Sequence, residues 1–108
     1  MIPFEVTILG SNSAIPAHGR HPSAQWIQMG RRFFLMDCGE GTQMQCARYQ
    51  KSIFKLGAVF ISHLHGDHIF GLPGLLTTLG LMGRTEPLCV YGTEGLENWL
   101  KTTFELSG

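Results

Sequence analysis

A short apolar run, residues 57–62 (GAVFIS), is followed directly by three histidines within the six residues 63–68 (HLHGDH). Four consecutive apolar residues in so short a run are typical of a strand that is covered on both faces. In open α/β sheets, functional side chains gather just beyond the carboxyl ends of such strands. We therefore expect the histidine-rich segment to lie at the carboxyl edge of a sheet.

The rest of the chain predicts one α/β (α+β) domain with a layered sheet and helices packed outside it. Residues 23–29 and 32–36 flank Gly30-Arg31 and indicate a β-hairpin. A helix from residue 42 to about 50 is expected to begin with Thr42 as its cap and to bury Met44, Ala47 and Tyr49. The other expected elements are strands at residues 3–10, 57–62 and 88–91, and helices at residues 72–82 and from residue 93 onward.

Charge and length exclude several classes of protein. The 108 residues hold eight basic and eight acidic side chains, and so the chain is not a free-standing polycationic nucleic-acid binder. Residues 1–55 nevertheless carry six basic and three acidic groups. This asymmetry has two interpretations: scatter over a solvated surface, or a mildly basic face near an anionic ligand.

The three cysteines cannot form a complete disulfide framework, and no C-x-x-C motif occurs. No stretch approaches the roughly 18 apolar residues that a membrane span needs. We also find no signal-peptide pattern in the first ten residues, and so we expect a cytoplasmic protein with reduced thiols and no membrane association.

The segment 63–68 has the chemistry of a metal site. Residues two apart in an extended segment point the same way, so His63 and His65 can bind one ion. A sharp turn at Gly66 would direct Asp67 and His68 toward a second ion. Imidazole and carboxylate ligands suit zinc, with manganese or iron as alternatives. The competing interpretation is an exposed, polar, histidine-rich loop.

A count of ligands predicts that this site is incomplete. A catalytic zinc commonly has about three protein ligands, and two such ions need about six, less any that they share. The segment supplies four. The remaining candidates, His18, His21, Asp37, the glutamates and the cysteines, are not clustered at ligand spacing. The sequence is therefore about two ligands short of a dinuclear site.

Three motifs together resemble one enzyme family. Residues 63–68 fit the H-x-H-x-D-H signature of the metallo-β-lactamase superfamily. The flanking sequence of residues 60–75 and the D-C-G-E-G-T-Q motif at residues 37–43 are similar to its tRNase Z (ribonuclease Z) branch. The resemblance covers essentially the whole chain. It implies an αββα sandwich, of which residues 1–108 would be the N-terminal part of a single, apparently truncated domain.

The resemblance also implies a reaction and a set of roles. The family cuts precursor tRNA just after the discriminator base, using two zinc ions, with Mn²⁺ as an alternative, and usually works as a homodimer. His63 and His65 would bind one zinc, and Asp67 and His68 the other. Asp67 would also be the general base, because a carboxylate beside a metal-bound water is well placed to take its proton.

Further residues gain roles from the same resemblance. Asp37 would hydrogen-bond around the metal ligands and orient them, unless it only satisfies a turn. Thr42 would lie at a phosphate-binding helix N-terminus, or would merely cap that helix. Arg20 ends the stretch 16–20 (PAHGR), where many members carry P-x-K-x-R. His18 replaces the lysine and is mostly neutral at pH 7, which predicts weaker phosphate affinity and puts CCA discrimination in doubt.

Two other functions remain open at this point. One is a different hydrolase of the superfamily, such as a phosphodiesterase, although the two flanking motifs disfavour it. The other is an inactive structural or dimerising fragment, because the isolated chain lacks part of the site.

Overall fold

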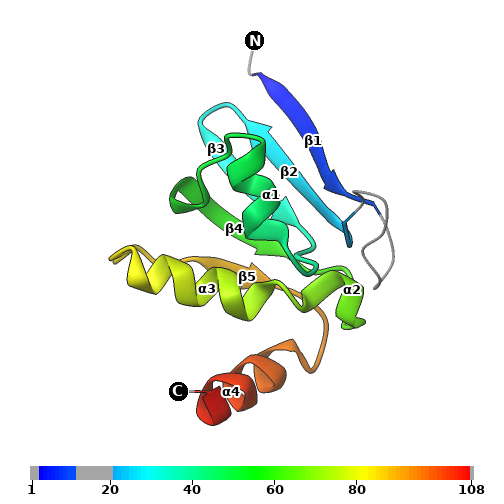
Figure 1. Cartoon of the computed structure of the whole chain (residues 1–108), viewed down its shortest axis with the longest axis vertical. Helices are drawn as coiled ribbons and strands as arrows, with labels where there is room; N and C mark the ends of the chain where they lie inside the picture. Colours follow the sequence, from blue (N-terminus) through cyan, green and yellow to red (C-terminus); the bar gives the residue numbers. More distant parts are fainter. Residues whose placement is uncertain (1–2, 12–20, 108) are drawn as a thin grey trace.

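The computed structural model describes residues 3–11 and 21–107, and its centre is a five-stranded sheet in the order β1-β2-β3-β4-β5 (Figure 1). The strands are β1 (Phe4–Gly10), β2 (Ala24–Met29), β3 (Arg32–Met36), β4 (Leu56–Phe60) and β5 (Cys89–Tyr91). The helices are α1 (Thr42–Arg48), the short 3-10 helix η1 (Ile53–Lys55), α2 (Gly66–Ile69), α3 (Leu72–Leu81) and α4 (Leu96–Ser107). All the strands expected from the sequence are present.

The sheet changes direction along its width. The strands β1, β2 and β3 pair antiparallel, whereas β4 pairs parallel to β3 and β5 parallel to β4. The hairpin turn falls at Gly30, whose φ of 64° is in the left-handed region that glycine tolerates. Because β3, β4 and β5 run the same way, their carboxyl ends meet at one edge, as the sequence predicts.

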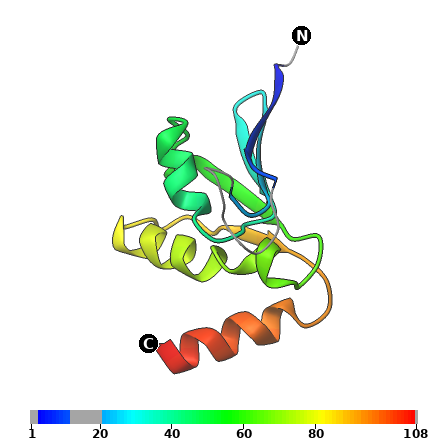
Figure 2. The same ribbon diagram turned by 45° about the vertical axis from the view of Figure 1, so that its right-hand side comes forward.

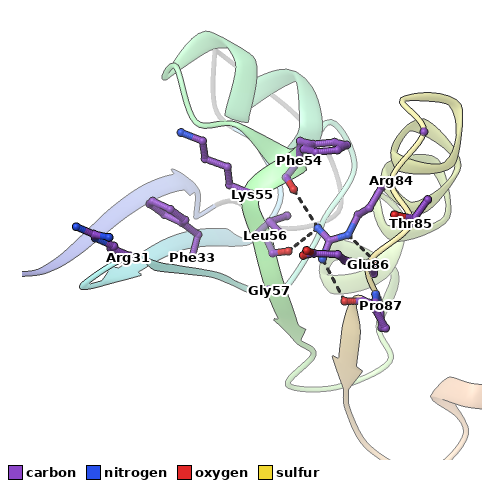
Figure 3. Close-up of a pocket in the computed structure, with 11 residues that line it drawn as sticks. Arg31, Phe33, Phe54, Lys55, Leu56, Gly57, Arg84, Thr85, Glu86 and Pro87 are labelled. Atoms are coloured by element: carbon purple, nitrogen blue, oxygen red, sulfur yellow. Dashed lines mark hydrogen bonds between the residues drawn. The ribbon is translucent and has the colours of Figure 1, made fainter.

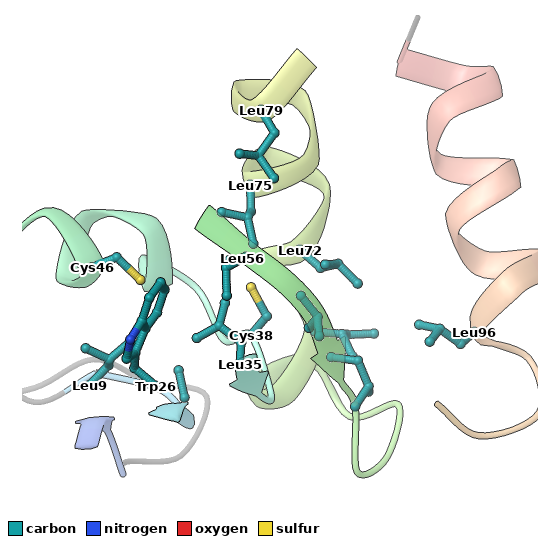
Figure 4. Packing of buried hydrophobic residues seen from close by; sticks show 14 residues of the cluster. Leu9, Trp26, Leu35, Cys38, Cys46, Leu56, Leu72, Leu75, Leu79 and Leu96 are labelled. Carbon is teal, nitrogen blue, oxygen red and sulfur yellow. The ribbon is translucent and has the colours of Figure 1, made fainter. Parts of the chain in front are cut away.

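The helices α1 and α3 lie on one side of the sheet, which Figure 2 shows most clearly. Beneath them Trp26, Leu35 and Leu56 are fully buried in the core (Figure 4). The inner face of α3 contributes Leu72, Leu75 and Leu79 at helical spacing. No helix in the described part of the chain has the length and apolar character needed to cross a membrane.

The expected inner face of α1 is wrong. Met44 is 72% exposed, Ala47 and Tyr49 are exposed as well, and the buried residues are Thr42, Gln45 and Cys46. A polar contact rotates the helix, since the side-chain amide of Gln45 donates to the Leu9 carbonyl at 2.8 Å. The spacing of apolar residues could not predict which face of α1 is buried, because one of its inward-facing residues is the polar Gln45.

The cap of α1 also differs from the expectation. Gly41, not Thr42, is the N-cap, and no side chain caps the helix. The Thr42 hydroxyl instead donates to the Gly39 carbonyl at 2.6 Å. In α4 the expected face is confirmed: Leu96 is buried, and Trp99, Leu100, Thr103 and Phe104 are partly buried while their neighbours are exposed.

The opposite face of the sheet is apolar and largely open. Register places Val6, Ile27 and Phe34 in one row across it, and Phe60 stacks on Tyr91 with ring centroids 5.1 Å apart. Within the described residues this face stays accessible, with Phe4 67% and Ile8 54% exposed. Patches of this kind mark surfaces that another layer or partner covers.

The core holds two thiols that stay protonated over the ordinary pH range. Burial raises the pKa of Cys38 to about 12 and that of Cys46 to about 12, from an ordinary value of 9.0. Cys89, by contrast, is exposed. Both buried thiols are therefore neutral near neutral pH.

These pKa values predict a loss of stability at alkaline pH. Below pH 9 the thiols are protonated in both states, and above it they ionise only in the unfolded chain, so the free energy of unfolding falls as pH rises toward 12. Urea unfolding from pH 8 to 10.5 measures this fall, and Cys46→Ala should make it shallower.

A thiol reagent at pH 8 should modify Cys89 rapidly and the buried pair only in denaturant. An equal rate at all three sites would contradict the assignment.

Candidate functional site

The histidine-rich segment lies just beyond β4, at the carboxyl edge of the sheet. His63 and His65 are exposed, and His65 is the N-cap of α2, whose four residues include Asp67 and His68. The expected turn at Gly66 is therefore the start of a short helix. Gly66 has little room for a side chain, because an added Cβ would collide with the Phe70 ring.

The three imidazole rings gather in one cluster. The His63 ring lies 4.9 Å from that of His65 and 3.8 Å from that of His68, measured between centroids. His63 is thus in contact with a residue on each side of the turn. The segment brings His63, His65 and His68 close together, with Asp67 beside His68; that these four residues bind metal stays a prediction.

Asp37 holds this cluster against the end of β3. It has a φ of 65°, a left-handed conformation, and is 4% exposed. Its carboxylate accepts a hydrogen bond from His68 Nδ1 at 2.7 Å, from the Ser62 backbone N–H at 2.8 Å and from the Ser62 hydroxyl at 2.9 Å. A buried carboxylate needs such donors, and here the three shortest bonds come from the segment that follows β4, with the Ser23 hydroxyl at 3.5 Å as a further donor.

Ser62 is a residue of this site that sequence reasoning missed. Its Oγ lies 3.1 Å from His63 Nδ1 and 2.9 Å from Asp37 Oδ1. A carboxylate can only accept, so the hydroxyl proton points to Asp37 and the oxygen accepts from His63. The sequence feature that could have identified Ser62 is its position between the buried strand and the first histidine.

These contacts fix the orientation of two imidazoles. With Nδ1–H donated to Asp37 from His68 and to Ser62 from His63, Nδ1 of each ring is engaged and Nε2 is the nitrogen that takes no part in these contacts. Metal-binding histidines in proteins commonly use this arrangement, in which a carboxylate or oxygen takes the other ring proton. Asp37 therefore has the position that the family resemblance implies.

The second nitrogen of His68 faces a carboxylate. His68 Nε2 lies 3.2 Å from Asp67 Oδ2. An imidazole lone pair and a carboxylate oxygen repel each other unless a positive charge, either a proton or a cation, lies between them. The donor types and their orientation fit a zinc-like ion at this place.

The described ligands form pairs rather than complete shells. Within residues 3–11 and 21–107, no three histidine, cysteine, aspartate or glutamate side chains are arranged to hold one ion. The donors are of the chemical types that zinc binds, but in this described part of the chain fewer than three of them converge on any one position.

The two motifs that flank the site meet through their glycines. An added Cβ on Gly71 would collide with the Gly39 carbonyl, and one on Gly39 would meet the Asp67 carbonyl at 2.5 Å. Backbone bonds join the same segments, from Cys38 N–H to the His68 carbonyl at 2.7 Å and from Gly71 N–H to the Cys38 carbonyl at 2.9 Å. The motifs thus lock the Asp37 loop onto α2, which explains why they occur together.

Two predicted phosphate contacts have different outcomes. Thr42 is 2% exposed and its hydroxyl is bonded to Gly39, so its position adds no support for a phosphate contact. Arg20 and His18 lie outside the described residues.

Comparison with known proteins identifies the family. A family model described as "Anti-Pycsar protein Apyc1" matches residues 4–103. The chain belongs to this family. Among curated relatives of this Apyc1-family chain, the Ribonuclease Z of Porphyromonas gingivalis is 49% identical over 105 residues, which are 97% of the chain and 34% of that protein. The chain spans about a third of the length of the curated relatives it matches.

Solved structures of relatives confirm the fold. Human tRNase Z, short form, superposes with a TM-score of 0.86 at 44% identity, covering 94% of the Apyc1-family chain and 39% of the human one. The metallo-β-lactamase fold protein YhfI from Bacillus subtilis gives 0.81 at 28% identity, covering 94% and 41%. The metallo-β-lactamase fold and the resemblance to tRNase Z are therefore confirmed.

The buried carboxylate predicts a specific stability effect. Asp37→Asn keeps one acceptor oxygen and replaces the other by an NH₂ group, so the donors of either Ser62 or His68 lose their partner, at a cost of about 1–3 kcal/mol in the free energy of unfolding. Urea unfolding measures it. Asp67→Asn makes the same chemical change at a partly exposed carboxylate and should cost clearly less. Equal losses in the two variants would show that Asp37 does not organise the site.

Proposed function

We propose that this chain carries part of the metal site of a zinc-dependent endoribonuclease, which removes the 3′ trailer from precursor tRNA. The observation that carries the proposal is the cluster of imidazoles at the end of β4, in which Asp37 and Ser62 engage Nδ1 of His68 and His63 and leave Nε2 of each ring to other partners. His63 and His65 would hold one zinc, and Asp67 and His68 a second, with Mn²⁺ as an alternative ion.

In this proposal the chain's own residues have separate tasks. Zinc, when bound, would activate water and neutralise charge that develops on the phosphodiester. Asp67 takes the proton of the attacking water on a carboxylate oxygen, since its side chain is partly exposed beside His68. Asp37 keeps the proton of His68 on Nδ1, and so it acts only through that ring.

We propose that further ligands come from sequence beyond these 108 residues, as the family resemblance implies. Two catalytic ions need about six ligands, and the described donors form only pairs. We therefore propose that the isolated chain is the N-terminal part of one domain and is inactive alone. The similarity to ribonuclease Z supports precursor tRNA as the substrate and, with the family resemblance, a cytoplasmic homodimer.

A second function has one observation in its favour. The family model carries the name of an anti-Pycsar protein rather than of a ribonuclease, and the fold is shared with other metallo-β-lactamase proteins. A phosphodiesterase acting on a smaller ester would use the same donors. The two functions differ in substrate and not in the site described.

Zinc binding tests the ligand assignment. Calorimetric titration of the metal-free chain should show weak binding of about one zinc, or of two with open positions. Asp37→Asn should weaken this binding about 10–100-fold by releasing His68, whereas Glu97→Gln on the exposed side of α4 should leave it unchanged. Tight binding of two ions by these residues alone would contradict the ligand count.

Substrate choice tests the reaction. The full-length gene product should cleave precursor tRNA at the 3′ end of the mature sequence and act poorly on bis(p-nitrophenyl) phosphate. Asp67→Asn should lower kcat about 10²–10⁴-fold, with a smaller change in KM, because it removes proton transfer. Cleavage of the small ester alone would favour the phosphodiesterase. Failure to cleave either with zinc bound would support an inactive structural role.

A further inference from the structure

Basic side chains of the N-terminal half gather at the end of the sheet that lies farthest from the histidines. Arg31 and Arg32 are in and after the β2–β3 turn, Arg48 ends α1, and Lys55 ends η1. All four are exposed. Of these, Arg31, Arg32 and Lys55 line one shared hollow, so part of the basic excess of residues 1–55 is concentrated there.

Strand register places two of these charges side by side. Phe33 of β3 pairs with Leu56 of β4, so the preceding residues, Arg32 and Lys55, enter the sheet as lateral neighbours. Adjacent strands lie about 4.8 Å apart, which is close enough for both cations to contact one phosphate group or two successive ones.

A hollow of about 560 Å³ opens beside these charges, lined by Arg31, Lys55 and Arg84 and by the rings of Phe33 and Phe54 (Figure 3). Arg84 lines one side of this hollow and is held in place by hydrogen bonds. Its guanidinium donates to backbone carbonyls of Phe54, Glu86 and Pro87 at 3.0–3.1 Å, and to that of Leu56. In Figure 3 Arg31 and Lys55 point away from this network, and so they are free to meet a ligand.

The hollow is cationic on balance. Glu86 is the one acidic residue that lines it, against three basic ones. Among the described residues, the lysine and arginine ion pairs are Lys51–Glu5 and Lys101–Glu97, and neither includes Arg31, Arg32 or Lys55. Phe54 is 45% exposed and lines the same hollow, with its ring on the Arg84 side in Figure 3.

We propose that this hollow is a second RNA-binding surface, in which Arg31 and Lys55 bind backbone phosphates and the Phe54 ring stacks with an unpaired base. Arg32, which lines a neighbouring hollow with the same two side chains, would extend the phosphate contacts. A positive groove with an adjacent aromatic ring is the common chemistry of single-stranded nucleic-acid binding. The inference rests on the proposed function for its partner, an RNA, but not on the metal site.

The position of the hollow assigns it a positioning role. Leu56 and His63 mark the two ends of the β4 segment, seven residues apart, which corresponds to roughly 23 Å of extended chain. The surface therefore contacts RNA away from the bond that is cut. It contributes to affinity and placement, and it takes no part in the chemical step.

A matched pair of single-charge variants tests this surface. Binding of the chain to fluorescein-labelled tRNA is measured by anisotropy at several salt concentrations. Lys55→Gln should weaken binding about 3–10-fold and lower the salt slope by about 1, whereas Lys101→Gln, the same change on α4, should have little effect. The double variant Arg31→Gln/Lys55→Gln should lose more tRNA affinity than Lys55→Gln alone. Phe54→Leu should weaken binding to an unpaired 3′ extension without changing the salt slope.

The outcomes separate this inference from the proposed function. Equal affinities for Lys55→Gln and Lys101→Gln would overturn the RNA surface even if the gene product cleaves precursor tRNA. Equal weakening toward poly-glutamate and tRNA, with no effect of Phe54→Leu, would overturn it in favour of an acidic protein partner. Weaker tRNA binding by the patch variants, with normal binding by Asp67→Asn, would support it even if cleavage is not found.

Discussion

The carboxylate of Asp37 is the point on which the site depends. It lies buried at the end of β3 in a left-handed conformation, and it collects hydrogen bonds from the residues that follow β4. Because a buried charge without donors is costly, the Asp37 loop and the histidine segment stabilise each other. Directly at His68 and through Ser62 at His63, the same network engages Nδ1 of each ring. Fold stability and the orientation of these imidazoles therefore share one interaction.

The surrounding packing makes that interaction possible. Parallel pairing of β3 with β4 brings Met36 beside Phe60, so that Asp37 and Ser62 emerge at the same edge. The glycines of the two flanking motifs then allow the Asp37 loop to lie directly against α2. On the other side, the sheet presents an open apolar face, which is what one layer of a sandwich would present to the next. The uncovered sheet face and the absence of a three-ligand group among residues 3–11 and 21–107 are consistent with the chain's share of its relatives' length.

The sequence predicted the elements that have strong local patterns and missed those that depend on distant polar contacts. Apolar runs and the Gly30 turn gave the strands, and the spacing along α4 gave its buried face. The face of α1 could not be predicted, because Gln45 reaches the Leu9 carbonyl, 36 positions away. The role of Ser62 was hidden for a related reason: serine has no metal-ligand signature, and its importance comes from lying between Asp37 and His63. The concentration of basic charge at one end required the strand register, which sequence alone does not supply.

The tautomers of the histidines test this account most directly. Long-range ¹H–¹⁵N correlation spectra of the metal-free chain, recorded at a pH where the imidazoles are neutral, distinguish a proton on Nδ1 from one on Nε2. The account predicts Nδ1–H for His63 and His68, and loss of that preference at His68 in Asp37→Asn. Nε2–H tautomers at both residues, unchanged by that substitution, would contradict the claim that Asp37 prepares these rings to bind metal.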